Sequence, residues 1–168
     1  ETVNLYAGFV ALGIKMLKPN GEIVAIIPRS FCNGPYYDSF RKFLINNTSF
    51  HHIHVFDSRN KAFGEDSVLQ ENIIIHCKKN GNQESVKITS SHSADFHIDK
   101  STDNIIASNM TSRVVYFDSI VKPYNHRNFI HISASNTDQQ VVDQLSCFTS
   151  SLDEVGVKVS TGPIVDFR

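Results

Sequence analysis

One large apolar ring stands in the middle of a polar stretch: Phe63 lies within residues 59–66 among charged and amide side chains. Because such a loop offers little core for the ring to join, its face is available to stack on a nucleobase, an interaction worth ~1–3 kcal/mol per base. Arg59 and Lys61 flank the ring and could contact phosphates, which position a nucleic acid without specifying its sequence. The plainer alternatives are that Phe63 pins its own loop and that the two charges are only solvated.

A second aromatic candidate is Phe9, in an apolar stretch over residues 3–18 that has helical spacing. Leu5 lies one turn earlier on the same face of the predicted helix. An aromatic face near the carboxyl edge of a sheet is suited to a flat ligand, because open α/β sheets bind ligands at that edge. The apolar stripe is too wide for a surface helix, so we expect cover on more than one side. The alternative is therefore an ordinary core phenylalanine.

Three histidines, His51, His52 and His54, could suggest a metal site. Strand alternation would place His52 beside His54 and His51 on the opposite face, and no cysteine or carboxylate cluster accompanies them. A solvated strand face is the better interpretation, so no metal is predicted. No serine–histidine–aspartate or paired-carboxylate pattern supports hydrolase chemistry.

Composition narrows the classes of protein that fit. With 168 residues, 40% of them hydrophobic, the chain can bury one core. A formal net charge of −1 argues against a stand-alone nucleic-acid binder, although residues 28–61 carry a local basic excess. The three isolated cysteines favour a reducing cytoplasm over a disulfide framework or a zinc site. No apolar run approaches the ~20 residues that cross a bilayer, and no signal peptide is recognisable.

The elements that must position these residues begin with the helix over 3–18, which Pro19-Asn20-Gly21 ends. The β-branched run at 23–27 predicts a strand buried on both faces of a largely parallel sheet. A loop over 28–34 then precedes a helix over 35–46 and a strand over 51–56, a unit expected to be parallel with a right-handed crossover. In that loop, Arg29 and Ser30 could face a ligand, although Ser30 or Asn33 could equally cap a helix.

The next predicted strand, at 69–76, gives the sharpest inference about topology. Only twelve residues, 57–68, separate it from its predecessor, and they lack helical periodicity. Because parallel neighbours need a crossover of about a dozen residues or more, usually helical, this pair is expected to be antiparallel. Weaker patterns follow, and the elements that they predict are strands at 84–89, 114–117 and 129–132, a capping box at 137–140 with a helix behind it, and extended pieces over 155–168.

Several short motifs occur together in one order. They are Asn-Leu-Tyr-Ala-Gly-Phe at 4–9, Leu-Lys-Pro-Asn-Gly at 17–21, Ile-Pro-Arg-Ser-Phe at 27–31, Val-Phe at 55–56, Ala-Phe at 62–63 and Val-Leu-Gln-Glu-Asn-Ile-Ile-Ile at 68–75. In this order they resemble adenine-N6-specific DNA methyltransferases of type II restriction–modification systems, well over residues 1–79 and weakly over 156–168. The family's glycine-rich cofactor loop and Asn-Pro-Pro-Tyr segment do not occur here; by resemblance they lie upstream, so the chain is expected to be a piece of a larger enzyme.

The resemblance implies an α/β fold: the C-terminal part of a Rossmann-like S-adenosylmethionine-dependent methyltransferase sheet that ends in a reversed antiparallel strand. It implies a division into the C-terminal half of the catalytic domain (1–80), a connector of mixed strands and a helix (81–154) and the start of a target-recognition domain (155–168). The expected partners are double-stranded DNA and the missing N-terminal half of the same protein, in a bacterial cytoplasm and without a membrane.

By the same resemblance, Phe9 with Leu5 lies against the adenine of S-adenosylmethionine, and Phe63 stacks on a target adenine turned out of the duplex. Arg59 and Lys61 are then candidate DNA contacts. The implied reaction transfers a methyl group to the exocyclic amine of adenine, and the chain alone is expected to be inactive. Two other classes stay open: a DNA-binding specificity or scaffold segment without transferase activity, and an unrelated nucleotide-binding α/β domain.

Overall fold

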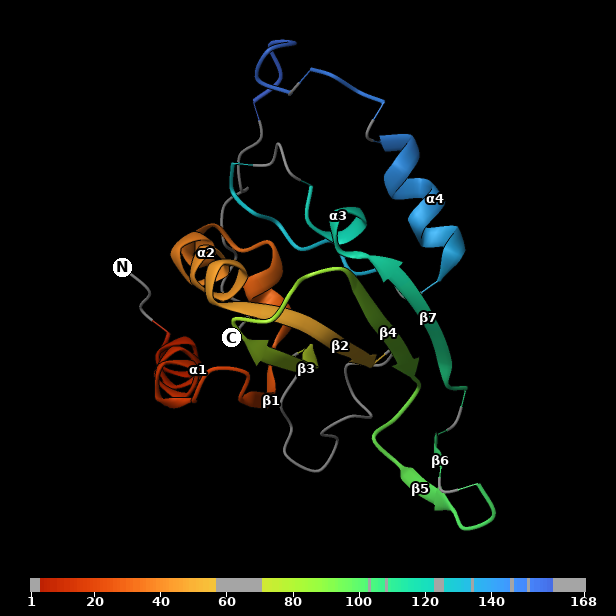
Figure 1. The fold of residues 1–168 in the computed structure, drawn as a ribbon. Coiled ribbons are helices and arrows are strands. Elements are labelled where there is room, and N and C mark those ends of the chain that lie inside the picture. Colours follow the sequence, from red (N-terminus) through yellow and green to blue (C-terminus); the bar gives the residue numbers. More distant parts are fainter. Residues whose placement is uncertain are drawn as a thin grey trace, which may run out of the picture. The chain divides into compact units, whose positions relative to one another are not determined.

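The computed structural model describes residues 4–56, 71–102, 104–107, 109–122, 126–133, 135–145, 147–150 and 152–158. The chain divides into two compact units, Glu1–Ala134 and Ser135–Arg168. The elements of the first unit are, in order, α1 (Leu5–Met16), β1 (Glu22–Pro28), the 3-10 turns η1 (Arg29–Cys32) and η2 (Pro35–Tyr37), α2 (Asp38–Asn47), β2 (Thr48–Phe56), β3 (Asn72–Lys79), β4 (Ser85–Ser91), β5 (Phe96–Asp99), β6 (Asn104–Ala107), β7 (Thr111–Tyr116) and α3 (Phe117–Ile120) (Figure 1).

The main sheet has the strand order β1-β3-β2-β4-β7. β3 is antiparallel to both β1 and β2, so those two strands run in the same direction on either side of it. The predicted antiparallel pairing of the strand at 69–76 with its predecessor is confirmed. The strand–helix–strand unit is parallel as expected, but its two strands are not neighbours, because β3 lies between them. β4 continues the sheet parallel to β2, and β7 pairs antiparallel with β4.

One face of this sheet carries the core. Ile73, Ile75 and Cys77 of β3 are fully buried there, and α1 and α2 contribute apolar side chains to the same cluster. Helix α1 begins at the N-cap Asn4, whose side chain accepts a hydrogen bond from the Tyr6 amide, 3.3 Å away. In α2, the buried face includes Phe40 and Leu44. Sequence periodicity predicted both helices, α1 within two residues and α2 within three residues of the observed ends.

The opposite face of the sheet is largely open near β1. Val24 and Ile26 are 66% and 56% exposed, so the expectation that β1 is buried on both faces is wrong for the described residues. The side of α1 that points away from the sheet is uncovered as well, since no described residue packs over its apolar stripe. The members of that stripe are Leu5, Phe9, Leu12 and Met16. Among the described residues, the wide apolar pattern of α1 therefore does not correspond to cover on more than one side.

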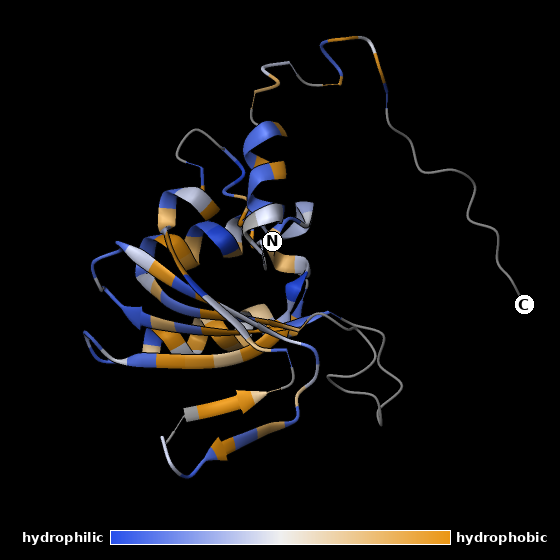
Figure 2. Ribbon diagram, turned by 90° about the vertical axis from the view of Figure 1, so that its right-hand side faces the viewer, coloured by the Kyte–Doolittle hydropathy of each residue, from blue (hydrophilic) through white to orange (hydrophobic). Residues whose placement is uncertain are grey.

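The β5–β6 hairpin, whose strands are rich in hydrophobic residues, stands beside the open face (Figure 2). Between hairpin and sheet is a groove of about 430 Å³. It is lined by Val24, His52, His54, Ile74, His76, Thr89, Phe96, His97, Ile98, Ile105 and Met110.

The histidine-rich strand β2 differs from its predicted form. The register shifts between Phe50 and His52, and the His51 ring lies 5.6 Å from the ring of His76, the residue paired with His52. His51 is therefore not isolated on the opposite face. His54 is buried rather than solvated, and its Nδ1 lies 2.7 Å from the Thr89 hydroxyl. Among the described residues, no group of three potential ligands is placed to hold a metal ion.

The second unit contains α4 (Asn136–Leu145). Its capping box is formed by Ser135 and Asp138, whose side chains accept hydrogen bonds from each other's backbone amides. The box predicted at 137–140 is thus displaced by two residues, since Ser135 offers a hydroxyl at the required position.

Two further predicted elements differ from the structure. In the first unit, the strand predicted at 129–132 is reduced to a single bridge between Val121 and Ile130. Residues 152–156 form turns rather than the extended start predicted at Val155.

Candidate functional site

The carboxyl ends of β1 and β2 meet at one edge of the sheet. There β3 begins between them, with Asn72 opposite Pro28 and Ile73 opposite Val55. Just beyond this edge, the Arg29 amide donates to the Glu71 carbonyl at 2.7 Å. Phe56 and Glu71, the described residues on either side of the segment 57–70, therefore lie at the edge where the loop after β1 (29–37) also begins.

The start of α1 reaches the same region through Tyr37 at the end of η2. Asn4 Nδ2 donates to the Tyr37 hydroxyl at 3.0 Å. The rings of Tyr6 and Tyr37 are stacked, with centroids 5.8 Å apart. Burial raises the pKa of the Tyr6 phenol, and its contact with Tyr37 adds to that effect. The two candidate regions, the start of α1 and the segment after β2, are thus joined through the loop that follows β1.

Leu5 and Phe9 lie on the outer side of α1, 76% and 65% exposed. Neither is a core residue of the described chain, and no described aromatic ring stacks on Phe9. Their proposed contact with a cofactor stays a prediction. Arg59, Lys61 and Phe63 lie outside the described residues, so their roles stay predictions too; only the ends of their segment, Phe56 and Glu71, are placed.

Arg29 was a candidate for a ligand-facing position, but its guanidinium is directed at the protein. Arg29 Nη2 donates to the Ile132 carbonyl at 2.9 Å, and Nη1 lies 3.9 Å from the Glu71 carboxylate. Ser30 and Asn33 do not cap α2, whose N-cap is Tyr37, without a side-chain hydrogen bond. Ser30 instead uses its backbone carbonyl, which accepts from the Gly34 amide at 2.9 Å.

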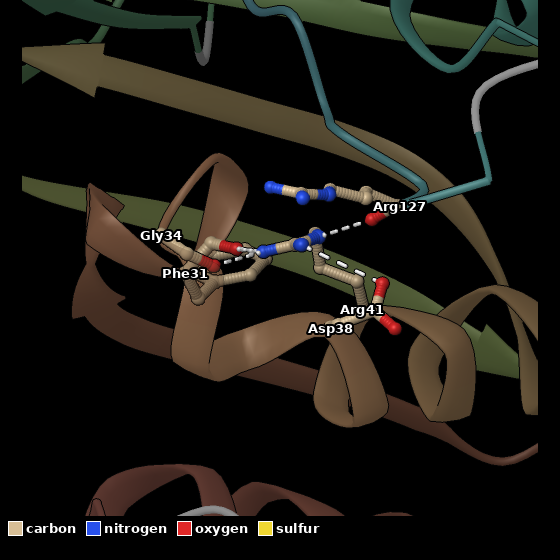
Figure 3. Close-up of polar contacts among 5 residues, drawn as sticks. All are labelled: Phe31, Gly34, Asp38, Arg41 and Arg127. Atoms are coloured by element: carbon tan, nitrogen blue, oxygen red, sulfur yellow. Dashed lines mark hydrogen bonds and ion pairs between the residues drawn. The ribbon is translucent and has the colours of Figure 1, made fainter. Parts of the chain in front are cut away.

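Arg41, on α2 near this edge, is fully buried although it is charged. Its Nη1 donates to the carbonyls of Phe31 at 2.8 Å and Gly34 at 2.7 Å, and its Nε donates to the carbonyl of Arg127 at 2.9 Å (Figure 3). Asp38 forms a longer ion pair of 3.6 Å with Nη2. Burial lowers the pKa of Arg41, and the Asp38 carboxylate opposes that shift.

Sequence reasoning did not single out Arg41. The available signal was its place on α2 directly after Phe40 and three residues before Leu44, both of which are buried. A charged residue on the apolar side of an amphipathic helix has to find partners inside the protein. The pattern could show that Arg41 needs such partners but could not identify backbone carbonyls from the loop after β1 and from Arg127.

The cysteines show how closely this region is packed. Cys32 at the end of η1 and Cys77 in β3 are buried, and burial raises the pKa of each thiol to about 12. Cys147 is exposed.

We expect iodoacetamide at pH 8 to alkylate the native chain at Cys147 alone, because the thiolate is the reactive form and burial suppresses it at the other two sites. Peptide mass spectrometry would locate the label. Unfolding in guanidinium should make all three cysteines reactive. Labelling of Cys32 in the native chain at a rate similar to that of Cys147 would contradict the close packing after β1.

The described part of the chain contains no helix that meets the length and apolarity needed to cross a membrane.

The fold matches known structures. One is the type IIG restriction endonuclease BpuSI, with a TM-score of 0.54 and 14% identity over 87% of this chain and 18% of that one. Another is the M protein of the type I restriction enzyme EcoKI, with a TM-score of 0.53 and 14% identity over 92% of this chain and 45% of that one. At these identities the similarity concerns the fold. The fold is thus α/β, the C-terminal part of a Rossmann-like methyltransferase sheet with the predicted reversed strand.

Sequence comparisons reach further. A family model described as Eco57I restriction-modification methylase matches residues 1–63. The chain is 45% identical, over all 168 residues, to type II methyltransferase M.BsuBI of Bacillus subtilis and to type II methyltransferase M.PstI of Providencia stuartii. It spans 31% of the length of each. Over its whole length, the chain is therefore similar to these two type II methyltransferases.

Proposed function

We propose that this chain is part of a site-specific DNA methyltransferase of a bacterial restriction–modification system, acting in the cytoplasm. The proposed reaction transfers a methyl group from S-adenosylmethionine to the exocyclic amine of an adenine in double-stranded DNA. The observation that carries this proposal is the meeting of three parts at one sheet edge: the start of α1, the loop after β1, and both ends of the segment 57–70. Ligands of open α/β folds bind at this edge.

The cofactor side of the proposed site is the outer face of α1. Phe9 offers an exposed aromatic face and Leu5 an exposed apolar side chain one turn nearer the edge, which suits the flat adenine of S-adenosylmethionine. When bound, the cofactor supplies an activated methyl group. Leu5 and Phe9 would hold its adenine and exclude water from it, since both side chains are apolar.

The DNA side of the proposed site is the segment 57–70. Phe63 would stack on the extruded adenine, while Arg59 and Lys61 would contact backbone phosphates. The support is that the segment's ends are fixed by the pairing of Val55 with Ile73 and by the hydrogen bond from Arg29 to Glu71. Phe56 and Glu71, the described residues on either side of the segment, therefore lie beside the start of the loop after β1.

The proposed partner in the same protein is the N-terminal half that holds the glycine-rich loop and the Asn-Pro-Pro-Tyr segment. Two features support such a partner: β1 pairs on one side only among the described strands, and its Val24 and Ile26 are exposed. The proposed division is 1–80 for the C-terminal half of the catalytic domain, 81–154 for the connector and 155–168 for the start of the target-recognition domain.

Replacing Phe9 by Ala in the complete enzyme is expected to weaken cofactor binding while leaving DNA affinity nearly unchanged. The lost stacking is on the order of 0.5–1.5 kcal/mol, which corresponds to roughly 2- to 13-fold in the dissociation constant. Calorimetric titration with S-adenosylmethionine would measure this change.

Met16→Ala is the matched control, because Met16 is also exposed, at 76%, and lies at the far end of the same stripe. Its cofactor affinity should match that of the wild type, and Phe9→Trp should retain most of the binding. Unchanged affinity in a stable Phe9→Ala protein would remove Phe9 from the site. Sequence-specific DNA binding by the complete wild-type protein without any methyl transfer would instead favour a specificity or scaffold segment.

A further inference from the structure

Residues 127–133, here called the strap, lie against η1 directly after β1 and accept hydrogen bonds from arginines. Three arginines from separate parts of the fold each donate to a different backbone carbonyl of the strap. The donors and acceptors are Arg41 of α2 to Arg127, Arg29 of η1 to Ile132, and Arg113 of β7 to Ser133. The strap is thus anchored at both ends by charge-assisted hydrogen bonds, which are stronger than neutral ones.

Backbone hydrogen bonds and apolar contacts hold the middle of the strap. The Ile130 amide donates to the carbonyl of Cys32 in η1 at 2.9 Å, and the His131 amide donates to the carbonyl of Ile120 at 2.7 Å. Ile130 and Ile132 are buried in the core cluster. The strap therefore contacts the loop after β1 directly as well as through Arg29.

Arg41 contacts the strap and the loop at the same time. Nε donates to the strap, while Nη1 donates to two carbonyls of the loop, those of Phe31 and Gly34. The ring of Phe129, also in the strap, lies 5.0 Å from the guanidinium carbon. The close approach of the backbone here requires a glycine, because a Cβ on Gly34 would lie 2.7 Å from the Ser30 carbonyl oxygen.

We infer that Arg41 is a positioning residue, which fixes the loop after β1 at the sheet edge by fastening it to the strap. This inference rests on the proposed function, in which the loop forms part of the wall around the reacting groups. Arg41 does not itself touch substrate or cofactor. Its guanidinium is suited to this task because its donors are held in a rigid planar fork, whereas a lysine has a single point of donation.

The test uses the complete enzyme with Arg41→Met, Arg41→Lys and the control Lys42→Met, which removes an exposed charge from the next position. Arg41→Met should lower the single-turnover rate at saturating DNA and cofactor by on the order of 10- to 100-fold, the loss expected of misplaced groups. The dissociation constant for S-adenosylmethionine should stay within about twofold, because the outer face of α1 is untouched. Lys42→Met should behave as the wild type.

Arg41→Lys is the informative variant, since an ammonium can replace Nη1 at the two loop carbonyls but cannot reach the strap as well. It should recover a measurable part of the rate lost in Arg41→Met. Hydrogen exchange gives a second readout: the Gly34 amide of the loop should stay protected in Arg41→Lys, while the Ile130 amide of the strap exchanges faster. In Arg41→Met both amides should exchange faster, with Ile75 in the sheet unchanged.

The outcomes separate the two ideas. A wild-type complete enzyme that transfers no methyl group would overturn the proposed function, while the exchange pattern would still decide what Arg41 holds. A wild-type rate and wild-type protection in Arg41→Lys and Arg41→Met would overturn the positioning role. The positioning role would also be overturned if exchange became faster evenly over Gly34, Ile130 and Ile75 while the methyl-transfer rate followed the folded fraction. That pattern is expected of general destabilisation.

Discussion

The variant Phe63→Ala of the complete enzyme is expected to methylate DNA up to ~100-fold more slowly than the wild type. The proposed role of the ring is to stack on the extruded adenine, and losing such a face costs ~1–3 kcal/mol in the flipped state. The methyl-donor site should be unaffected, because Leu5 and Phe9 lie on a different element. Single-turnover kinetics would measure the rate, and cofactor titration would verify that the donor still binds.

A fluorescent adenine analogue at the target position would report extrusion of the base directly, since it brightens when it is unstacked. Phe63→Trp should retain much of the activity, because the requirement is for an aromatic face rather than a polar group. Lys61→Met is a useful control: as a proposed phosphate contact, Lys61 should affect DNA affinity and its salt dependence more than the chemical rate. If Phe63→Ala matches the wild type in rate and fluorescence, the ring serves only to anchor its own loop.

The 168-residue chain by itself is expected to transfer no methyl group and to bind S-adenosylmethionine too weakly for routine calorimetry. Its sequence contains neither a glycine-rich cofactor loop nor an Asn-Pro-Pro-Tyr segment. In the proposed enzyme those groups hold the cofactor's carboxylate and ribose and the target amine. The 168-residue chain, which forms one wall of the proposed site, cannot replace those groups, because orientation of the reacting groups provides much of the rate acceleration.

A tritium-transfer assay with DNA containing many candidate sites would test this expectation. Supplying the N-terminal half of a complete enzyme as a separate polypeptide is the matching gain-of-function experiment. Activity in the mixture alone would agree with the division proposed here. Measurable transfer by the chain without any addition would show that it already carries the complete catalytic apparatus.

Sequence periodicity predicted the elements that follow local rules. The helical spacing in α1 and α2 and the turn at Pro19-Asn20-Gly21 are determined by nearby residues, so their positions agree with the structure. The antiparallel β3 could be inferred as well, because the short segment before it leaves no room for a helical crossover. The position of β3 between β1 and β2 could not, since strand order depends on contacts between distant residues.

The candidate site was less accessible to sequence reasoning. Arg29 looked available to a ligand, yet its acceptor is a carbonyl more than a hundred residues later, at Ile132. The burial of Arg41 depends on the same distant strap. The exposure of Val24 and Ile26 was also missed, because a continuous apolar strand predicts burial without showing which residues provide it.

The insertion of β3 between two earlier strands has a consequence for the order of folding. β1 and β2 are both synthesised before the strand that joins them, and the pairing of Glu22 with Lys78 closes a loop of more than fifty residues. Until β3 emerges from the ribosome, the edges of β1 and β2 that will pair with it carry unpaired backbone groups. Such non-local pairing is slow, so a nascent chain in which β1 and β2 have emerged but β3 has not would expose two unpaired strand edges open to aggregation.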